Sequence, residues 1–433
     1  MDARLDSSFE SWGLFTEKLA DRPNTPGRLS YSPEKGVELE LVPTAGAVDP
    51  DSLLSMRSAP KLYGQLVDGT LVTLVDCFIT SVGLGAGGIG LPTVLVANRM
   101  LLGAHIDDLD HTKTKWYSVE FSSLANWTCT SPPEWSIASD DGSPMGVDLR
   151  YRWPEPIHVP AGDSGFDLKI SHGWQTFSAS GSLGIRWHAH IAIEAHDTMV
   201  LRDANEAAWQ CQNLLSLFIG HPVSMKSIAI KPASADPRSA TEHPLTLIFQ
   251  QRGKHDQPDL YPPQMLLPYA SVKDDFPQIV RRWFGRSEQQ VLAANVFFGS
   301  QLLESPVVNV KFLAVMQAAE SYHRALGTGV YSLRKRLTSM LDRIPEDARR
   351  RIAGDVPRFV AKVVDTRNYY THYDSASRAN VFDGRGAFIA SERLRVLVVA
   401  NLLHDLGIPD ESLLSVLERS REYQHWLSQD LPL

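Results

Sequence analysis

The sequence predicts an α+β multidomain protein, in which an N-terminal, mainly β domain is followed by an all-α helical bundle. Three observations support this fold class. The chain has 433 residues, which is too long for a single compact core. Its first part repeats strand–turn–strand patterns, and from about Phe276 apolar residues recur at helical spacing. We therefore expect a β-rich domain over residues 1–270 and an all-α domain over residues 271–433.

The β elements are predicted from alternating apolar residues and from turn residues. Strand patterns occupy residues 26–42, 63–79, 184–197, 227–230 and 245–250. Within the second of these, Asp68-Gly69 is a pair that favours positive φ in a tight hairpin. Residues 204–219 instead carry apolar side chains at helical spacing. Residues 251–275 contain four prolines, at 258, 262, 263 and 268, and are expected to form a loop or linker.

Capping residues locate the helices of the C-terminal part. Ser305-Pro306 opens a helix that Gly327 can end, and Pro345-Glu346-Asp347 opens another that closes near Gly354. Asp355 is expected to cap a third helix. Two more are expected over residues 390–406 and 410–428.

Composition bounds the cell compartment and the chemistry. Three scattered cysteines indicate a reducing compartment and no disulfide framework. The acidic, polar N-terminus lacks the layout of a signal peptide. The one long uncharged run, residues 77–98, contains glycines and a proline, so we expect a hairpin and not a membrane span. The predicted location is cytoplasmic.

Charge is unevenly distributed between the two parts. Residues 271–433 carry 22 Lys and Arg against 19 Asp and Glu, a net charge of +3, so the remainder carries −11 of the total of −8. This difference places any nucleic-acid contact in the helical part. Its basic clusters, Arg334-Lys335-Arg336 and Arg349-Arg350-Arg351, are candidates for following an RNA backbone. Solvated helix faces are the alternative interpretation.

Three patterns that resemble functional motifs have simpler explanations. Residues 83–90 contain G-x-G-x-x-G, but a strand pattern follows where a dinucleotide site needs a helix. His188 and His190 share a strand face with Glu194 and His196, as the polar outer face of a half-buried strand would. His404-Asp405 resembles a metal phosphohydrolase dipeptide without the further ligands. A metal enzyme centred on His188 and His190 stays open as an alternative, but we expect no metal site and no cofactor.

The stretch "DTRNYYTHYD" at residues 365–374 ends the helix that Asp355 begins. Its apolar stripe, formed by Phe359, Val360, Val363 and Val364, turns polar at Arg367, Asn368 and His372. Charge placed where a core face should continue costs free energy unless it lines a cleft. Arg367 and His372 lie about 140° apart around an ideal helix, whereas Asn368 and His372 are neighbours.

These residue types suit RNA cleavage without a metal. Histidine transfers protons at neutral pH, and the guanidinium of arginine matches the charge that builds on a phosphate in the transition state. The 2′-OH of RNA is then the nucleophile.

The Arg367-Asn368-x-x-x-His372 pattern resembles the R-x(4–6)-H motif of HEPN ribonucleases. Its helical surroundings are similar too, including "FLAVMQAAESYHRAL" (312–326) and "QIVRRWF" (278–284). The first part resembles the N-terminal domain of ApeA-type anti-phage defence proteins, through "PGRLSY", "VTLVDCF" and "CQNLLSLFIGHPV". The resemblance covers most of the chain.

The resemblance implies a metal-independent endoribonuclease that acts in abortive infection as a homodimer or higher homo-oligomer. His372 is then the acid and base, Arg367 stabilises the phosphorane, and Asn368 orients. Glu320 is a possible supporting residue, or else a solvated helix glutamate. The N-terminal domain would sense a trigger, for example one derived from phage, or restrain the nuclease. A non-catalytic module that dimerises or binds nucleic acid or nucleotides is the alternative.

Overall fold

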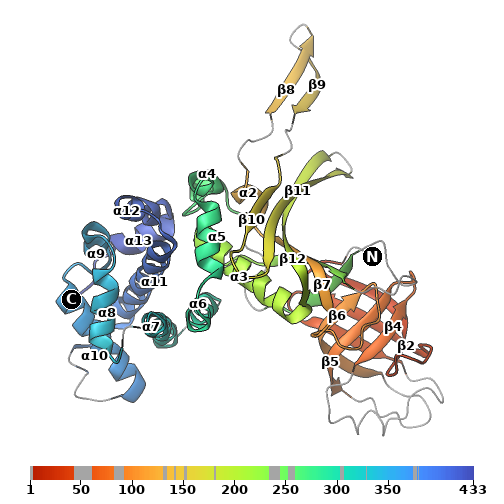
Figure 1. Ribbon diagram of the computed structural model, residues 1–433, viewed down its shortest axis with the longest axis horizontal. Helices are drawn as coiled ribbons and strands as arrows, with labels where there is room; N and C mark the ends of the chain where they lie inside the picture. Colours follow the sequence, from red (N-terminus) through yellow and green to blue (C-terminus); the bar gives the residue numbers. More distant parts are fainter. Residues whose placement is uncertain are drawn as a thin grey trace.

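The computed structural model of the protein describes most of the chain. It covers residues 3–433 except 43–60, 82–91, 130–133, 141–142, 151–153, 180–181, 234–243, 252–258, 303–306, 328, 374–377 and 379. The predicted fold class is confirmed, because a β-rich N-terminal part is followed by helices (Figure 1). The glycine-rich run 83–90 and the predicted helix start Ser305-Pro306 lie outside the described residues.

Most strands join one large antiparallel sheet. They are β1 (Phe9–Thr16), β2 (Thr25–Ser32), β3 (Gly36–Leu41), β4 (Leu62–Leu66), β5 (Leu71–Ser81), β6 (Thr93–Leu102), β7 (Lys113–Phe121), β10 (Ile157–Pro160), β11 (Phe166–Ala179), β12 (Ser182–Val200), β13 (Met225–Pro232) and β14 (Leu245–Phe249). Their order is β10-β11-β12-β7-β13-β14-β6-β3-β2-β1-β4-β5. A separate hairpin, β8 (Glu134–Asp140) with β9 (Ser143–Arg150), projects from the body of the protein (Figure 1).

One end of the sheet closes on itself. Because β5 also pairs with β6, strands β6, β3, β2, β1, β4 and β5 form a six-stranded barrel. Its interior is filled by fully buried side chains, among them Leu29, Val37, Leu74 and Met100. The β5–β6 pairing agrees with the hairpin predicted for the uncharged run 77–98.

The turn between β4 and β5 corrects one sequence-based expectation. Of the pair Asp68-Gly69, only Gly69 has positive φ, at +86°. Asp68 instead accepts a hydrogen bond on Oδ1 from the backbone N–H of Thr70 at 3.0 Å. The turn thus needs a single left-handed residue, and the aspartate contributes through its side chain.

Helices form the second part, and two of them, α2 and α3, lie within the first. They are α2 (Leu124–Trp127), α3 (Leu201–Ile219), α4 (Tyr269–Val272), α5 (Phe276–Phe284), α6 (Glu288–Gln301), α7 (Val308–Ala325), α8 (Leu333–Asp342), α9 (Glu346–Ala353), α10 (Val356–His372), α11 (Gly384–Leu406), α12 (Asp410–Arg419) and α13 (Arg421–Ser428). A short 3₁₀ turn covers Pro262–Gln264. The last two long predicted helices differ from expectation. Asp383 caps α11 earlier than predicted, and Ser420, in extended conformation, separates α12 from α13.

Helix α11 forms the centre of the helical part. Its run of apolar residues surrounds the whole helix, so nearly every side chain from Ala387 to Leu403 is buried. Helices α5, α7, α8, α9, α12 and α13 pack around it. This arrangement places the end of α10 at the outside of the helical part, away from the barrel (Figure 1).

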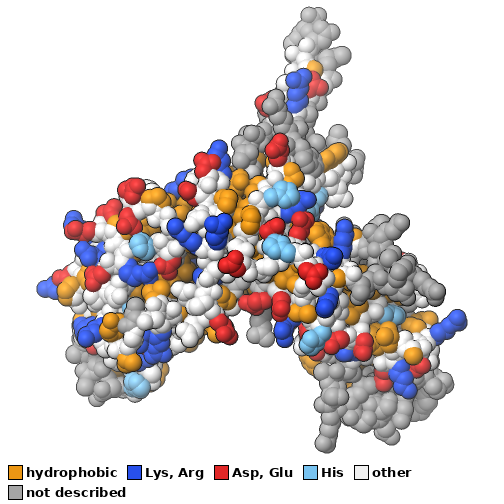
Figure 2. Space-filling view, in the orientation of Figure 1, with side chains coloured by type: hydrophobic (Ala, Val, Ile, Leu, Met, Phe, Trp, Pro, Cys, Tyr) orange, Lys and Arg blue, Asp and Glu red, His pale blue; other side chains and the backbone are white. Residues whose placement is uncertain are grey.

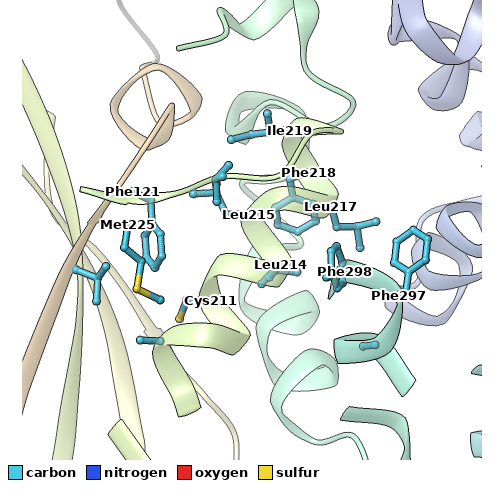
Figure 3. Close-up of a cluster of buried hydrophobic side chains, with 14 of the residues drawn as sticks. Phe121, Cys211, Leu214, Leu215, Leu217, Phe218, Ile219, Met225, Phe297 and Phe298 are labelled. Carbon is cyan, nitrogen blue, oxygen red and sulfur yellow. The ribbon is translucent and has the colours of Figure 1, made fainter. Parts of the chain in front are cut away.

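Helices α3, α5 and α6 connect the two parts (Figure 1). Helix α3 packs on β7 and β12, where the Tyr117 hydroxyl lies 3.0 Å from Asn205 Oδ1. On its other side Asn213 donates a hydrogen bond to Asn295 of α6 at 2.9 Å. Leu217 of α3 and Phe298 of α6 lie on facing sides of the same hydrophobic cluster (Figure 3).

Candidate active site at the end of helix α10

Helix α10 carries the motif into a defined position. Asp355 accepts a hydrogen bond from the backbone N–H of Arg358 at 3.0 Å and so begins the helix. Phe359, Val360 and Val363 are buried, as the apolar stripe predicted. Beyond them the Thr366 hydroxyl accepts from the backbone N–H of Phe382 at 3.1 Å, which fixes the last turns against the start of α11.

Arg367 is held from two sides. Its side chain is 31% exposed, and its Nη1 donates to Asn368 Oδ1 at 3.3 Å. Its Nη2 lies 3.9 Å from Oε2 of Glu320 on α7. Two contacts restrict a long side chain but leave part of the guanidinium available to a phosphate.

Glu320 lies against the motif and is not a solvated helix residue. Only 12% of its side chain is exposed, and its Oε1 accepts from Nη2 of Arg324 at 2.6 Å. One carboxylate therefore balances two arginines, Arg324 and Arg367. Two cations around a single carboxylate leave net positive charge at this place, as binding of a polyanion requires.

His372 is the last residue of α10 and is exposed. Tyr373 then takes the left-handed conformation, with φ of 52°, and its N–H donates to the carbonyl of Tyr369 at 2.6 Å. Within the described part of the chain, no hydrogen bond or ion pair joins His372 to Arg367. The regular helix keeps them on different faces, as the five-residue spacing predicts.

Three tyrosines surround the motif, and the sequence analysis assigned them no role. The ring of Tyr369 lies 5.9 Å from that of Tyr370 and 5.8 Å from that of Tyr373. Tyr370 packs edge-on against Phe312, and burial raises its pKa. Tyr373 is 65% exposed. In the sequence, Tyr369 and Tyr373 lie four residues apart on either side of His372. This spacing could have indicated that both rings lie beside the motif.

The arginines and the lysine of the two basic clusters differ in exposure and in ion pairing. Arg336 was a candidate for RNA binding, but it is 6% exposed and its Nε donates to the carbonyl of Tyr331 at 3.0 Å. Arg349 pairs with Asp342 at 3.2 Å and Arg350 with Glu346 at 2.6 Å.

Of the two basic clusters, only the first therefore has charged side chains without an ion pair among the described residues. Arg334 and Lys335 are exposed, and no ion pair engages them within the described part of the chain. Across the helical part, charges of both signs are interspersed on the face shown in Figure 2.

The histidines of β12 contact other side chains of the same sheet. The rings of His188 and His190 lie 4.9 Å apart, and burial together with the charge of His188 lowers the pKa of His190. His196 pairs with Asp167 at 3.1 Å, and Glu194 lies 3.9 Å from Lys169. Among the described residues, no three His, Cys, Asp or Glu side chains gather where they could hold a metal ion.

His404 and Asp405 point to different partners. His404 Nδ1 lies 3.1 Å from Asp410, at the start of α12. Asp405 accepts hydrogen bonds from Tyr322 of α7 and Arg343 beyond α8. The dipeptide thus connects α11 to its neighbouring helices.

In the part of the chain that the structure describes, no helix is both long and apolar enough to span a membrane.

Two family models match the chain, one beginning in its N-terminal part and one in its C-terminal part. Residues 11–283 match the model of ApeA N-terminal domain 1, and residues 313–412 match the model of the Apea-like HEPN domain. Comparisons with curated proteins and with solved structures found no match. The two family matches confirm the resemblance drawn from the sequence, including its order along the chain.

Proposed function

Because the chain belongs to the family that joins an ApeA N-terminal domain to an Apea-like HEPN domain, we propose that it is a metal-independent endoribonuclease of anti-phage defence. HEPN domains generally imply ribonuclease activity, and ApeA-type domains suggest defence against phage. The observation that carries the proposal is the polar end of α10. It combines a partly exposed Arg367, held by Glu320 and Asn368, with an exposed His372.

In the proposed reaction the 2′-oxygen attacks the adjacent phosphorus and the bond to the 5′-oxygen breaks. One histidine accepts the 2′ proton, and a second, protonated histidine donates a proton to the leaving oxygen. The products are a 2′,3′-cyclic phosphate and a 5′-hydroxyl. Arg367 stabilises the negative charge of the phosphorane, so the step needs no metal ion.

A dimer supplies the second histidine. One α10 provides a single Arg367 and a single His372, on different faces of the helix, whereas the reaction uses a separate acid and base. An isologous interface that brings two α10 ends together places both sets at one cleft. The exposed position of His372, at the last residue of α10, suits such a contact.

The N-terminal part is proposed to sense a trigger, for example one derived from phage, or to restrain the nuclease. It carries the −11 net charge, which would repel RNA phosphates if placed near the cleft. The proposed partners are therefore RNA and a second copy of the chain, and the proposed location is cytoplasmic.

The test is to sequence RNA ends from cells that express the wild type, His372→Ala or His404→Ala during phage challenge. We expect new 2′,3′-cyclic phosphate ends with the wild type and His404→Ala, and none with His372→Ala. Purified protein should cleave equally with and without EDTA. Activity that disappears with EDTA and returns with manganese or zinc would overturn the metal-free mechanism.

The shared site is tested by mixing two inactive chains. An Arg367→Ala chain paired with a His372→Ala chain still places one arginine and one histidine at the cleft. Cleavage should return at a reduced rate, because the single histidine supplies only one of the two proton transfers. Arg358→Ala is the matched control, because Arg358 is an exposed arginine on the same helix. A strictly monomeric protein that cleaves at full rate would contradict the composite site.

A further inference from the structure

A cavity of about 690 Å³ lies between the outer face of the barrel and helix α3. Its walls come from β5 and β6, from the turn before β3, from β14 and from the first half of α3 (Figure 1). Small-molecule sites are cavities of roughly 300 to 1,000 Å³. No residue of α10 lines this cavity, so what it binds does not depend on the proposed nuclease activity.

One wall of the cavity presents an exposed aromatic ring. Phe78 lies on β5 opposite Val96 of β6, and 50% of it is exposed. Trp209 of α3 and Phe249 of β14 form another apolar wall, but their rings stack on each other, with centroids 6.4 Å apart. Phe78 is therefore the ring that can stack on a planar ligand.

Amide side chains form the polar part of the wall. Asn98 and Gln250 are exposed, and Asn205 of α3 is half-buried. Gln250 Nε2 donates to the carbonyl of Glu34 at 2.6 Å, and Asn205 Oδ1 lies 3.0 Å from the Tyr117 hydroxyl. The opposite amide atoms, Gln250 Oε1 and Asn205 Nδ2, form no hydrogen bond within the described part of the chain. They offer an acceptor and a donor, as the edge of a nucleobase requires.

One of the basic side chains in the wall is already neutralised. The side chain of Arg99 is 26% exposed, and it lies 2.5 Å from Asp110 and 2.8 Å from Asp76. With two carboxylates beside it, Arg99 has little capacity left for an anion. We therefore assign it a structural role, in which it connects β6 to β5 and to the segment before β7.

Two other basic side chains supply available positive charge, although the N-terminal part has a net charge of −11. Lys35, in the turn before β3, is exposed and forms no ion pair among the described residues. Arg202, in the first turn of α3, lies 3.3 Å from Asp203, and their side chains are 67% and 57% exposed. A pair this exposed contributes little, so a phosphate can take up the guanidinium.

We propose that this cavity binds a nucleoside monophosphate. Its base stacks on Phe78 and hydrogen-bonds to the amide side chains, and its phosphate pairs with Lys35 and Arg202. Phe78 and Lys35 belong to the barrel and Arg202 belongs to α3, so the bound nucleotide contacts both. Helix α3 also contacts α6 of the helical part, through Asn213 and Asn295. The ligand thus lies against an element that connects the two parts of the chain.

The test is isothermal titration of the full-length protein with the 5′-monophosphates of adenosine, guanosine, cytidine and uridine. For the tightest of the four we expect a Kd on the order of 10 µM, from the ligand efficiency of drug-sized molecules. The matching nucleoside lacks the phosphate and should bind about tenfold more weakly or worse. Added salt should weaken binding of the nucleotide more than that of the nucleoside, because it screens exposed charges.

Substitutions separate the two halves of the ligand. Lys35→Gln and Arg202→Gln should each weaken nucleotide binding about tenfold and leave the nucleoside unaffected. Lys18→Gln is the matched control, because Lys18 is an exposed lysine of the N-terminal part outside the cavity. Phe78→Ala should weaken nucleotide and nucleoside alike, by about tenfold. Trp12→Ala is its control, since Trp12 is also 50% exposed, on strand β1 of the barrel.

The proposal is supported if the charge variants lose only the contribution of the phosphate and Phe78→Ala loses that of the base. It is overturned if none of the four nucleotides binds at 1 mM (about 100 times the expected Kd), or if Lys35→Gln and Phe78→Ala bind like the wild type. Equal affinity for nucleotide and nucleoside would overturn the phosphate site. If Phe78→Ala fails to fold, ribose 5-phosphate, which lacks the base, tests the same contact: an affinity equal to that of the nucleotide would overturn base stacking.

Discussion

Arg367 on α10 and Arg395 on α11 are both paired with helix glutamates, but their surroundings differ. The side chain of Arg395 is 9% exposed and meets two carboxylates at 2.8 and 2.6 Å. That of Arg367 is 31% exposed, and its one glutamate, at 3.9 Å, also pairs with Arg324. A buried charge must be fully compensated to be tolerated, and then has little capacity left for an anion. The partly exposed arginine keeps that capacity, which separates a functional position from a structural one.

The largest expected effect is on catalysis at the exposed arginine. Arg367→Ala should lower the cleavage rate by about 10²–10³, the loss typical for one group that stabilises transition-state charge. Its free energy of unfolding should change by no more than about 0.5 kcal/mol, because Glu320 keeps Arg324. Single-turnover cleavage and urea denaturation measure the two quantities. A cleavage rate like that of the wild type would remove Arg367 from the site.

The buried arginine should show the opposite pattern. Arg395→Met leaves Glu422 without its close partner, and we expect a loss of about 3–5 kcal/mol of stability. Arg351→Met is the matched control: Arg351 is 39% exposed and, among the described residues, forms its one ion pair with Glu418, so about 0–1 kcal/mol is expected. Equal urea midpoints for both variants would contradict the distinction drawn from burial.

A smaller effect is expected from the tyrosine beside His372. If Tyr373 stacks on a base of the RNA, Tyr373→Ala should weaken RNA binding by about 1–3 kcal/mol. Its effect should appear in KM more than in kcat. Tyr261→Ala is the control, because Tyr261 is 66% exposed, like Tyr373 at 65%, but lies outside the helical part. An identical KM for the two variants would argue against stacking at this position.

The smallest effect should come from the carboxylate that holds Arg367. Glu320→Gln keeps the shape but removes the charge, so Arg367 loses one of its two restraints. We expect a rate lowered about three- to tenfold, through misplacement of the guanidinium. Glu346→Gln, in another i,i+4 pair with an arginine, should leave the rate unchanged. A rate increase in Glu320→Gln would mean that the glutamate competes with RNA for Arg367.

Several features of this protein follow from local sequence alone. The hairpin of β2 and β3, the helix α3 and the cap of α10 at Asp355 were predicted, since each depends on residues close together in the chain. The polar end of the α10 stripe was visible for the same reason. Helical periodicity shows which residues leave the core face, without any knowledge of what they meet.

Tertiary structure alone decided which distant residues meet. Glu320 and Arg367 are brought together by the packing of α7 beside α10, and the barrel closes because β5 pairs with β6. Burial of Arg336 and the cavity between α3 and the barrel likewise depend on contacts between separate elements. Periodicity determines the face of an element on which a side chain lies. Which other element packs against that face depends on the packing of the whole chain.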